Sequence, residues 1–596
     1  MYVQPTKNRF VTFVITVCAI VINGQPEANG QKPFGDFEEY ELPHLSRPNL
    51  GEIPERKFIY PEGLIPLWVR ALDRDETQLS RLVIDSVSIA HQRGVEGVES
   101  LEPRLLALAK RDELSPNLAV SVANALVQFG HQANSAVLAE LASKYGPSVA
   151  SLVEPALAAW KSDSMETVWS ERLQRGIASE AEMILAVRGI VAIGSEENYE
   201  AIRRLVLDEK ISPSLRLEAA RQFAIVNQEG LVDLARQLAD RSATSPYHRL
   251  LAIKLLGTHT DSQTILFLNE CLESSSSAVQ SVAMQGLYRI KPSLVEELSE
   301  RFAGSSDANV RKCIIDALAD AASIKRIAPL CEFLNDPNPH LRRLAAVYCV
   351  DLASNQDLRE SVYESLVAIQ SREQWQGCEQ ATWALGTLKY LPSGLRMVKL
   401  LEHPRSDVKV AAAWGLYQLR QSEHLPAMLR YSESVWNGFQ SGKMNSMMRG
   451  IDLQQALLFD SFGDQKFSQA KPLMMKYVPK NFDIGIDARV AAVWALGMLH
   501  EDSVETDLAN ALNARLNDDG QFPEVEDVRN MSAVSLGRMR AESALESLKK
   551  YAGGGMPGSN WALERMIGLA PPPLRPNQFF VDDWFLSPAL GSTPQD

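Results

Sequence analysis

The amino-acid sequence predicts an all-α fold, an α-solenoid in which antiparallel helix pairs stack side by side along the chain. The first observation is a globular composition, with 45% hydrophobic and 22% charged residues among 596. The second is a sequence pattern that returns mostly every 31 to 33 residues. The third is an apolar stripe at helical spacing within each repeat. A period in this range is typical of solenoids, because each unit buries its apolar face only against its neighbours.

Residues 1–30 read as an export signal. Lys7 and Arg9 precede the apolar run 10–22, which as a helix would cover about 20 Å, less than the ~30 Å core of a bilayer. Ala28 and Gly30 stand at the −3 and −1 places of a cleavage site before Gln31. We therefore expect a periplasmic or secreted protein without a stable membrane span after cleavage. The alternatives are an uncleaved anchor or a buried helix.

The repeat region is bordered by two proline-containing segments. Residues 31–62 contain five prolines and several aromatic residues, and are interpreted as a tether. Residues 571–596 open with three prolines and carry an aromatic and acidic stretch at 579–585. We interpret this segment as a C-terminal tail, and residues 63–570 as the solenoid.

Twelve repeat units align when Val310 and Val408 are both taken as position zero of a unit. The positions zero are 118, 149, 182, 215, 248, 279, 310, 341, 377, 408, 488 and 528. The gap of 80 residues before 488 predicts a diverged unit near Arg449, and another unit is expected near Leu79. The solenoid should therefore contain about 13–14 repeats.

Each unit is predicted to hold two helices. Position eight is apolar in all twelve units, and position four is Val, Ala or Ile in every unit except the one with Ser532, so positions zero, four, eight and eleven form one helical stripe. Ser212-Pro213 and Ser245-Pro246 are typical of helix N-termini. A second amphipathic helix precedes each of these, for example over residues 325–334 and 394–401.

The sequence pattern shared by the units, which we call the repeat line, resembles that of the HEAT-repeat family, in the short form found in phycobilisome lyases. Residues 487–497 read Asp-Ala-Arg-Val-Ala-Ala-Val-Trp-Ala-Leu-Gly, and Asp527-Val528-Arg529 with Leu536-Gly537 follows the same line. The resemblance covers roughly residues 63–550 and implies stacked helix pairs. It also implies that the basic residue at position one pairs with an acidic residue of an adjacent repeat. Here that position holds Arg216, Arg249, Arg311, Arg342, Lys409, Arg489 and Arg529.

Catalytic and metal-binding motifs are absent from the sequence. There is no His-Glu-x-x-His, Cys-x-x-Cys or Gly-x-Ser-x-Gly, and the nine histidines are scattered. The sequence therefore predicts no cofactor and no enzyme activity. Cys313 and Cys349 fall on the apolar side of their helices and are expected to be buried thiols. One disulfide involving Cys271 and Cys331 is left open.

The function that remains is recognition. We expect an exported, non-enzymatic scaffold that holds a protein or an extended anionic or carbohydrate-like polymer along a concave solenoid surface. The net charge of −14 argues against nucleic acid as a partner. One alternative is a cofactor-attachment enzyme like the bilin lyases that carry these repeats. The other is a self-assembling coat or surface-layer component.

Position six supplies the candidate ligand-binding residues. At 100° per residue it lies far from the core stripe and is expected to be exposed or lateral. Along the array it holds Asn124, Pro155, Arg188, Arg221, Lys254, Gln285, Asp316, Val347, Trp383, Trp414, Trp494 and Val534. The cations Arg188, Arg221 and Lys254 followed by three tryptophans predict a groove for an anionic or carbohydrate-like ligand. The alternative is that the tryptophans wedge between neighbouring helices.

Overall fold

The computed structural model describes residues 63–566, apart from 75, 177, 228, 242–244, 321–322, 445–449, 482 and 553–555. Across those ranges every regular element is a helix, so the predicted all-α class is confirmed. The export signal, the tether and the C-terminal tail predicted from the sequence lie outside the described residues.

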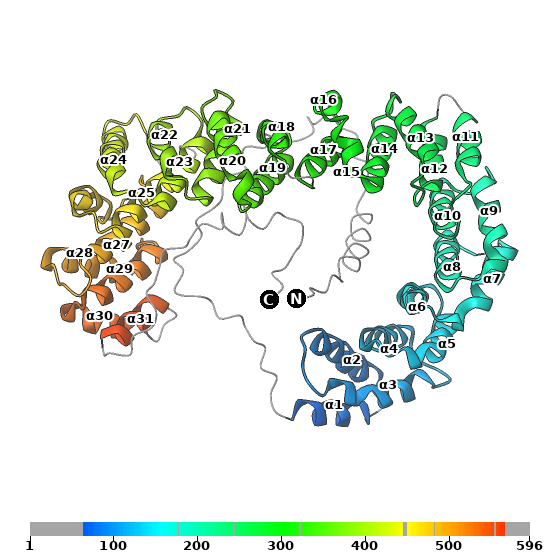
Figure 1. Ribbon diagram of the computed structural model, residues 1–596. Coiled ribbons are helices and arrows are strands. Elements are labelled where there is room, and N and C mark those ends of the chain that lie inside the picture. The colour runs from blue at the N-terminus through cyan, green and yellow to red at the C-terminus, as the bar shows by residue number, and fades with distance from the viewer. Residues whose placement is uncertain are drawn as a thin grey trace, which may run out of the picture. The chain divides into compact units, whose positions relative to one another are not determined.

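The described helices alternate between two layers, which we call A and B. The B helices carry the repeat line read from the sequence, and each follows its A partner in the chain (Figure 1). The A helices are α1 (Leu64–Leu72), α3 (Glu102–Ala109), α5 (Ser135–Tyr145), α7 (Glu166–Arg175), α9 (Tyr199–Leu207), α11 (Val232–Asp240), α13 (Ser262–Leu272), α15 (Pro292–Glu296) with α16 (Ser299–Phe302), α18 (Ile324–Glu332), α20 (Gln356–Gln370), α22 (Gly394–Leu400), α24 (Leu425–Gln440), α26 (Lys471–Met474), α28 (Thr506–Leu516) and α30 (Leu545–Ala552). The B helices are α2 (Thr77–Gln92), α4 (Pro116–Phe129), α6 (Pro147–Ala159), α8 (Glu180–Ile193), α10 (Pro213–Val226), α12 (Pro246–Leu255), α14 (Ser277–Ile290), α17 (Ala308–Asp320), α19 (Pro339–Leu352), α21 (Trp375–Thr387), α23 (Ser406–Leu419), α25 (Ile451–Asp464), α27 (Ile486–Leu499), α29 (Glu526–Met539) and α31 (Pro557–Met566).

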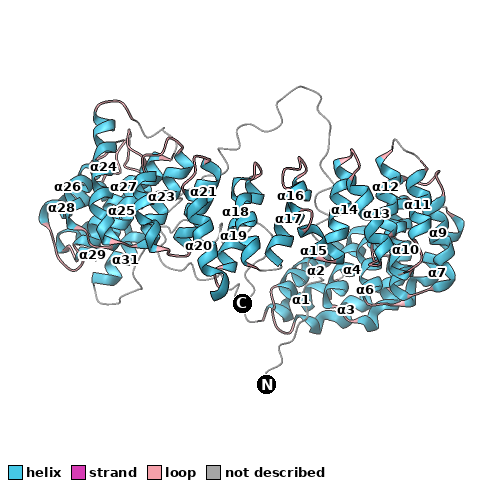
Figure 2. Ribbon diagram, turned by 45° about the horizontal axis from the view of Figure 1, so that its top comes forward, coloured by secondary structure: helices cyan, strands magenta, loops and turns pink. Residues whose placement is uncertain are grey.

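The B layer is the continuous element of the fold. Each B helix packs against the B helix before and after it, as α25 does with α23 and α27, and also against its own A partner. Figure 2 shows the same two-layer arrangement of helices joined by short loops. Every repeat is therefore stabilised by its immediate neighbours, as the quasi-one-dimensional energetics of solenoids require. None of the helices within the described ranges is both long and apolar enough to cross a bilayer.

The starts of the B helices follow from local sequence. Ser115 and Ser212 each accept a hydrogen bond from a backbone N–H three residues later, and each is followed by a proline in the first turn. Ser179 and Glu182 form a reciprocal capping box at the start of α8. These contacts satisfy backbone donors that the first helical turn leaves without partners.

The ends of several B helices carry a cation in the left-handed conformation. Lys389, Arg420, Lys466 and Arg540 stand at position twelve of their repeats, with φ between 51° and 58°. A positive charge there complements the carbonyl end of the helix. Three of these side chains also pair with a carboxylate of a neighbouring repeat: Arg420 with Asp464, Lys466 with Glu501 at 3.2 Å, and Arg540 with Asp502 at 2.6 Å.

The apolar stripe forms the core between the layers. Leu126, Ile190, Leu318, Leu416 and Leu536, all at position eight, are at most 2% exposed. The two units that the alignment placed by interval alone correspond to helix pairs in the structure. Helix α25 occupies the gap before residue 488, and α2 covers the region around residue 79.

Candidate binding surface

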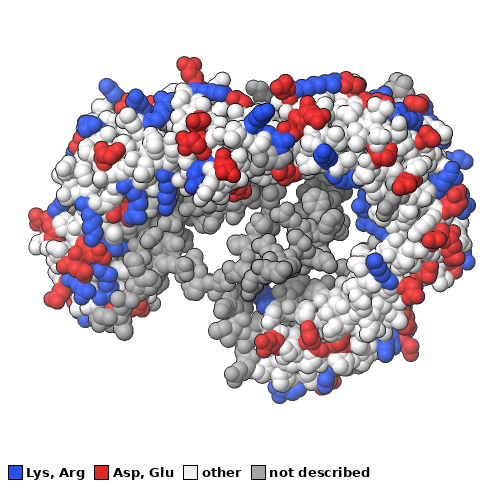
Figure 3. All heavy atoms as spheres, in the orientation of Figure 1, with Lys and Arg blue, Asp and Glu red and all other residues white. Residues whose placement is uncertain are grey.

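The exposed side chains of the B helices form the surface on which the sequence predicts a ligand, and we call it the B face. Lysine, arginine, aspartate and glutamate are interspersed over the side of the molecule in view in Figure 3. The charges at position six form a row that is ordered along the chain, with cations on α8, α10 and α12 and an aspartate on α17.

Arg188, Arg221 and Lys254 lie on three successive B helices, α8, α10 and α12, and we call them the basic cluster. A residue that the sequence analysis did not single out joins the two arginines: Glu218 Oε1 accepts hydrogen bonds from Arg188 Nε at 2.7 Å and from Arg221 Nη2 at 2.8 Å. Glu218 stands three residues before Arg221, which is the spacing of neighbours on one helix face. This spacing is therefore the sequence pattern that could have identified Glu218 as a partner of Arg221.

The electrostatics of the basic cluster favour an anion. Burial would raise the pKa of Glu218, but the hydrogen bonds from Arg221 and Arg188 outweigh it and lower that pKa to about 2. Burial lowers the pKa of the half-buried Lys254, and the nearby Arg221 lowers it further, whereas Glu218 raises it. Because three cations surround one carboxylate, the cluster keeps an excess of positive charge.

Farther along the chain the B face becomes acidic. Asp316 Oδ2 on α17 accepts a hydrogen bond from Lys312 at 2.7 Å, and Asp316 Oδ1 accepts one from Tyr348 Oη of α19 at 2.9 Å. Asp320, one turn later, accepts a hydrogen bond from Tyr288 Oη of α14. Position six therefore changes from cations on α8–α12 to a hydrogen-bonded aspartate on α17.

The prediction that Trp383, Trp414 and Trp494 line an open groove is wrong. Their exposed fractions are 4%, 1% and 3%. The rings of Trp383 and Trp414 contact each other with centroids 4.7 Å apart, so the tryptophans are wedged between adjacent B helices. This arrangement is the alternative left open by the sequence.

Glycines of the preceding B helix make room for two of these rings. A Cβ added at Gly386 would lie 2.7 Å from the Trp414 ring, and one added at Gly463 would lie 2.7 Å from the Trp494 ring. Carbon atoms that are not bonded to each other do not approach that closely, so only glycine at these positions leaves room for the tryptophan ring. Gly386 stands at position nine of its repeat. A glycine at position nine, followed in the next repeat by a tryptophan at position six, is therefore the sequence pattern that could have predicted the buried rings.

The position-one arginines act inside the fold. Arg311 Nε donates to Asp336 Oδ2 at 2.7 Å, and Arg489 Nη2 donates to Glu524 Oε2 at 2.6 Å, each carboxylate belonging to the next repeat. Arg216, Arg342 and Arg529 donate to backbone carbonyls at the ends of their own A-layer segments, at Val206, Asp336 and Leu516. These arginines thus stabilise carbonyl groups that a helix end leaves without partners. The acidic partner implied by the resemblance is present for Arg311 and Arg489.

A carboxylate of α25 caps the start of α27 and lies near a second carboxylate, Asp487. Asp452 Oδ1 accepts the backbone N–H of Ala488 at 2.8 Å, and Oδ2 accepts that of Asp487 at 3.1 Å. Burial, together with the charge of Asp452, raises the pKa of Asp487 to about 7. No group of three or more His, Cys, Asp or Glu residues suited to a metal ion occurs in the described part of the chain.

Asp487→Asn is expected to stabilise the protein at pH 8 by about 2 kcal/mol and to have little effect at pH 4. The folded-state pKa of Asp487 lies above the ordinary value of 3.8, so its ionisation weakens the fold as pH rises from about 4 through 7. Denaturant unfolding of both proteins across this range measures the effect. Asp507→Asn, at an exposed aspartate in the first turn of α28, is the control and should give no gain that grows with pH. An equal gain at both pH values would contradict the assignment.

Comparison with known proteins identifies the repeat. Residues 268–351, from α13 to α19, match the HEAT-repeat family model. The chain is similar to Kap95p in its structure with RanGDP (12% identity, 84% of this chain and 72% of that chain, TM-score 0.45) and to yeast importin-β (12%, 85% and 73%, TM-score 0.42). It is also similar to the CpcE–CpcF complex of phycocyanin lyase from Nostoc (18%, 42% and 95%, TM-score 0.27). No curated protein sequence matches this chain.

Proposed function

We propose that this HEAT-repeat protein is a non-enzymatic scaffold that binds an acidic segment of a protein partner on its B face. The observation that carries the proposal is the basic cluster, in which Arg188 and Arg221 share Glu218 and Lys254 lies beside them. Charge-assisted hydrogen bonds from such groups are the strongest that a surface offers to a carboxylate.

Glu218 prepares the two arginines for a ligand. The side chains of Arg188 and Arg221 are 44% and 49% exposed, whereas that of Glu218 is 13% exposed. The carboxylate therefore holds one edge of each guanidinium and leaves other N–H groups available to an incoming anion. Because the arginines are already ordered, binding loses less side-chain entropy than it would with mobile cations.

A protein segment fits the B face better than a uniform polyanion. Beyond the basic cluster the row continues with Asp316 and Asp320 on α17, which would repel a polymer that carries negative charge along its whole length. A polypeptide can place acidic residues against α8–α12 and neutral or basic residues against α17. Complementary charge of this kind fixes the register of a partner as well as its affinity.

The proposal places the scaffold outside the cytoplasm, in the periplasm or secreted. This location is inferred from the export signal predicted in residues 1–30, where Lys7 and Arg9 precede a short apolar run. The proposal that it is non-enzymatic rests on the missing catalytic motifs and on the structural roles of its buried charges, such as the capping by Asp452.

Neutralising the basic cluster is expected to weaken partner binding at least tenfold without unfolding the protein. The variant combines Arg188→Gln, Arg221→Gln and Lys254→Gln, which keep hydrogen-bonding side chains but remove three charges. Each charge-assisted hydrogen bond lost is worth about 1.5–3 kcal/mol. The partner is captured from the exported fraction with the wild-type chain, and its Kd is then measured for both proteins at two salt concentrations.

The matched control is Arg236→Gln in the A layer. Arg236 on α11 pairs with Glu270 of the next repeat at 2.7 Å, so the variant removes a similar inter-repeat ion pair away from the B face and should leave the Kd unchanged. Wild-type affinity in the triple variant would overturn the proposal. Heparin serves as a competing polyanion. If heparin binds the basic cluster and displaces the captured partner at a lower concentration than an acidic peptide does, the result would favour a polymer ligand instead.

A further inference from the structure

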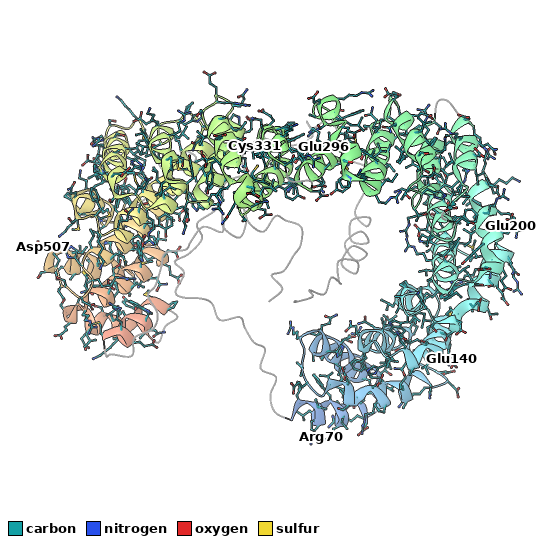
Figure 4. All side chains as sticks on the ribbon, in the orientation of Figure 1. Arg70, Glu140, Glu200, Glu296, Cys331 and Asp507 are labelled. Carbon is teal, nitrogen blue, oxygen red and sulfur yellow. The ribbon has the colours of Figure 1, made fainter. Side chains whose placement is uncertain are left out.

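Two buried cysteines face each other inside one helix pair. Cys331, labelled in Figure 4, comes from α18, and Cys349 comes from α19. Their Sγ atoms are 3.4 Å apart, and the residues are 1% and 0% exposed. The two thiols thus lie at the contact between the A and B helices of a single repeat.

The other described cysteines lack such a neighbour. Cys378 Sγ donates to the Gln370 carbonyl at 3.4 Å, and Cys271 and Cys313 have no sulfur within hydrogen-bonding distance among the described residues. The sequence left open a disulfide that involves Cys271 and Cys331. In the structure Cys271 lies on α13, in a different repeat, and the neighbour of Cys331 is Cys349.

We propose that Cys331 and Cys349 form an intramolecular disulfide that joins α18 to α19 in the mature protein. The oxidant is a disulfide of the exported compartment, either a protein or a small molecule. One cysteine thiolate attacks that disulfide and releases one thiol, and the second cysteine thiolate then displaces the other half from the mixed disulfide. Both protein thiols lose their protons, one S–S bond forms, and the oxidant leaves as two thiols.

Burial controls when this reaction occurs. Hydrogen bonding to Cys331 and burial both raise the pKa of the Cys349 thiol, so little reactive thiolate is present once the helix pair has closed. The bond therefore forms while α18 and α19 are still docking. Once formed, it is shielded from reductants and closes the short loop between residues 331 and 349, which restricts the unfolded chain.

Alkylation in denaturant tests the proposal on the exported full chain. Without reductant, iodoacetamide should modify every cysteine except Cys331 and Cys349, whereas after reduction it should modify all of them. The unreduced protein should weigh about 2 Da less, and proteolysis should give one linked peptide pair that contains both residues. Amide hydrogen exchange in α18 and α19 should become at least tenfold faster after reduction.

The control variant is Cys313→Ala, a buried cysteine of α17 without a sulfur neighbour, which should leave the linked peptide intact. Cys331→Ala should abolish the linked peptide and free Cys349 for alkylation, and the wild-type measurement stands even if this variant folds poorly. Full alkylation of the unreduced exported protein would overturn the proposal. A linked peptide that contains Cys271 would do the same. Partner binding is measured separately, so failure here leaves the proposed function intact.

Discussion

Replacing Arg489 with methionine is expected to destabilise the C-terminal helix pairs by about 3–5 kcal/mol. Arg489 and Glu524 are 1% and 0% exposed at their side chains, and the arginine also donates to the carbonyls of Tyr477 and Pro479. The variant leaves a buried carboxylate and two carbonyl groups without their main donor, which costs far more than the net value of the ion pair.

The stability lost in the Arg489→Met variant should depend on pH. Burial would raise the pKa of Glu524, but the hydrogen bonds from Arg489, the Val525 backbone and Arg515, together with the charge of Arg489, outweigh it and lower that pKa. Without Arg489 the pKa of the buried carboxyl rises, because only Arg515 at 3.4 Å and the Val525 N–H at 2.9 Å remain as its partners. The group then takes up a proton as pH falls, and its poorly compensated charge disappears. The penalty should therefore be greatest at pH 8 and smaller at pH 4, as measured by denaturant unfolding or by hydrogen exchange in α27 and α29.

Two controls separate the buried charge from lost packing. The double variant Arg489→Met with Glu524→Met removes both charges and should recover much of the loss. Arg241→Met breaks the exposed pair with Glu209, whose side chains are 39% and 65% exposed, and should cost less than about 1 kcal/mol. If Arg489→Met also lowered the free energy of unfolding by less than about 1 kcal/mol, the stability of the fold would not depend on the pairing of Glu524 with Arg489.

The core of the fold could be predicted because it repeats. Leu318 and Leu536 occupy the same position of different units, and a stripe that recurs many times is strong evidence even when each copy is weak. Helix α25 was placed only by its interval, and the polar residue Gln454 stands at its position zero. Its side chain donates to the Leu401 carbonyl at 3.1 Å and accepts a hydrogen bond from Tyr431 at 2.8 Å. These partners are distant in sequence, so no local pattern shows them.

The candidate site was predictable for its charges and not for its tryptophans. Arg188 and Arg221 are exposed because a guanidinium stays near water or a carboxylate wherever its helix places it. Trp414 stands at the same repeat position, yet its ring enters the space above Gly386. Helical periodicity gives the direction of a side chain relative to its own helix. It does not say how closely the next helix approaches, and that distance decides whether position six is exposed.

Trp414→Ala is expected to destabilise α21 and α23 by about 3–5 kcal/mol, since it removes a buried indole and leaves a cavity. Trp414 is 1% exposed and contacts the ring of Trp383 and the backbone at Gly386. Hydrogen exchange should lose protection in α21 and α23 and keep it in α8, because solenoid repeats depend on their neighbours. Trp160→Ala, at the partly exposed tryptophan that directly follows α6 as its C-cap, should cost less.

A double-mutant cycle with Gly386→Ala tests the wedge directly. In the wild-type background the added Cβ would lie 2.7 Å from the Trp414 ring, so we expect a loss of about 1–3 kcal/mol from overpacking. In the Trp414→Ala background the ring is gone, and the same substitution should cost much less, because alanine also favours the helix and fills part of the cavity. The two changes should therefore couple by at least about 1 kcal/mol. If the two losses simply add, the Trp414 ring does not occupy the slot at Gly386, and its burial has another cause.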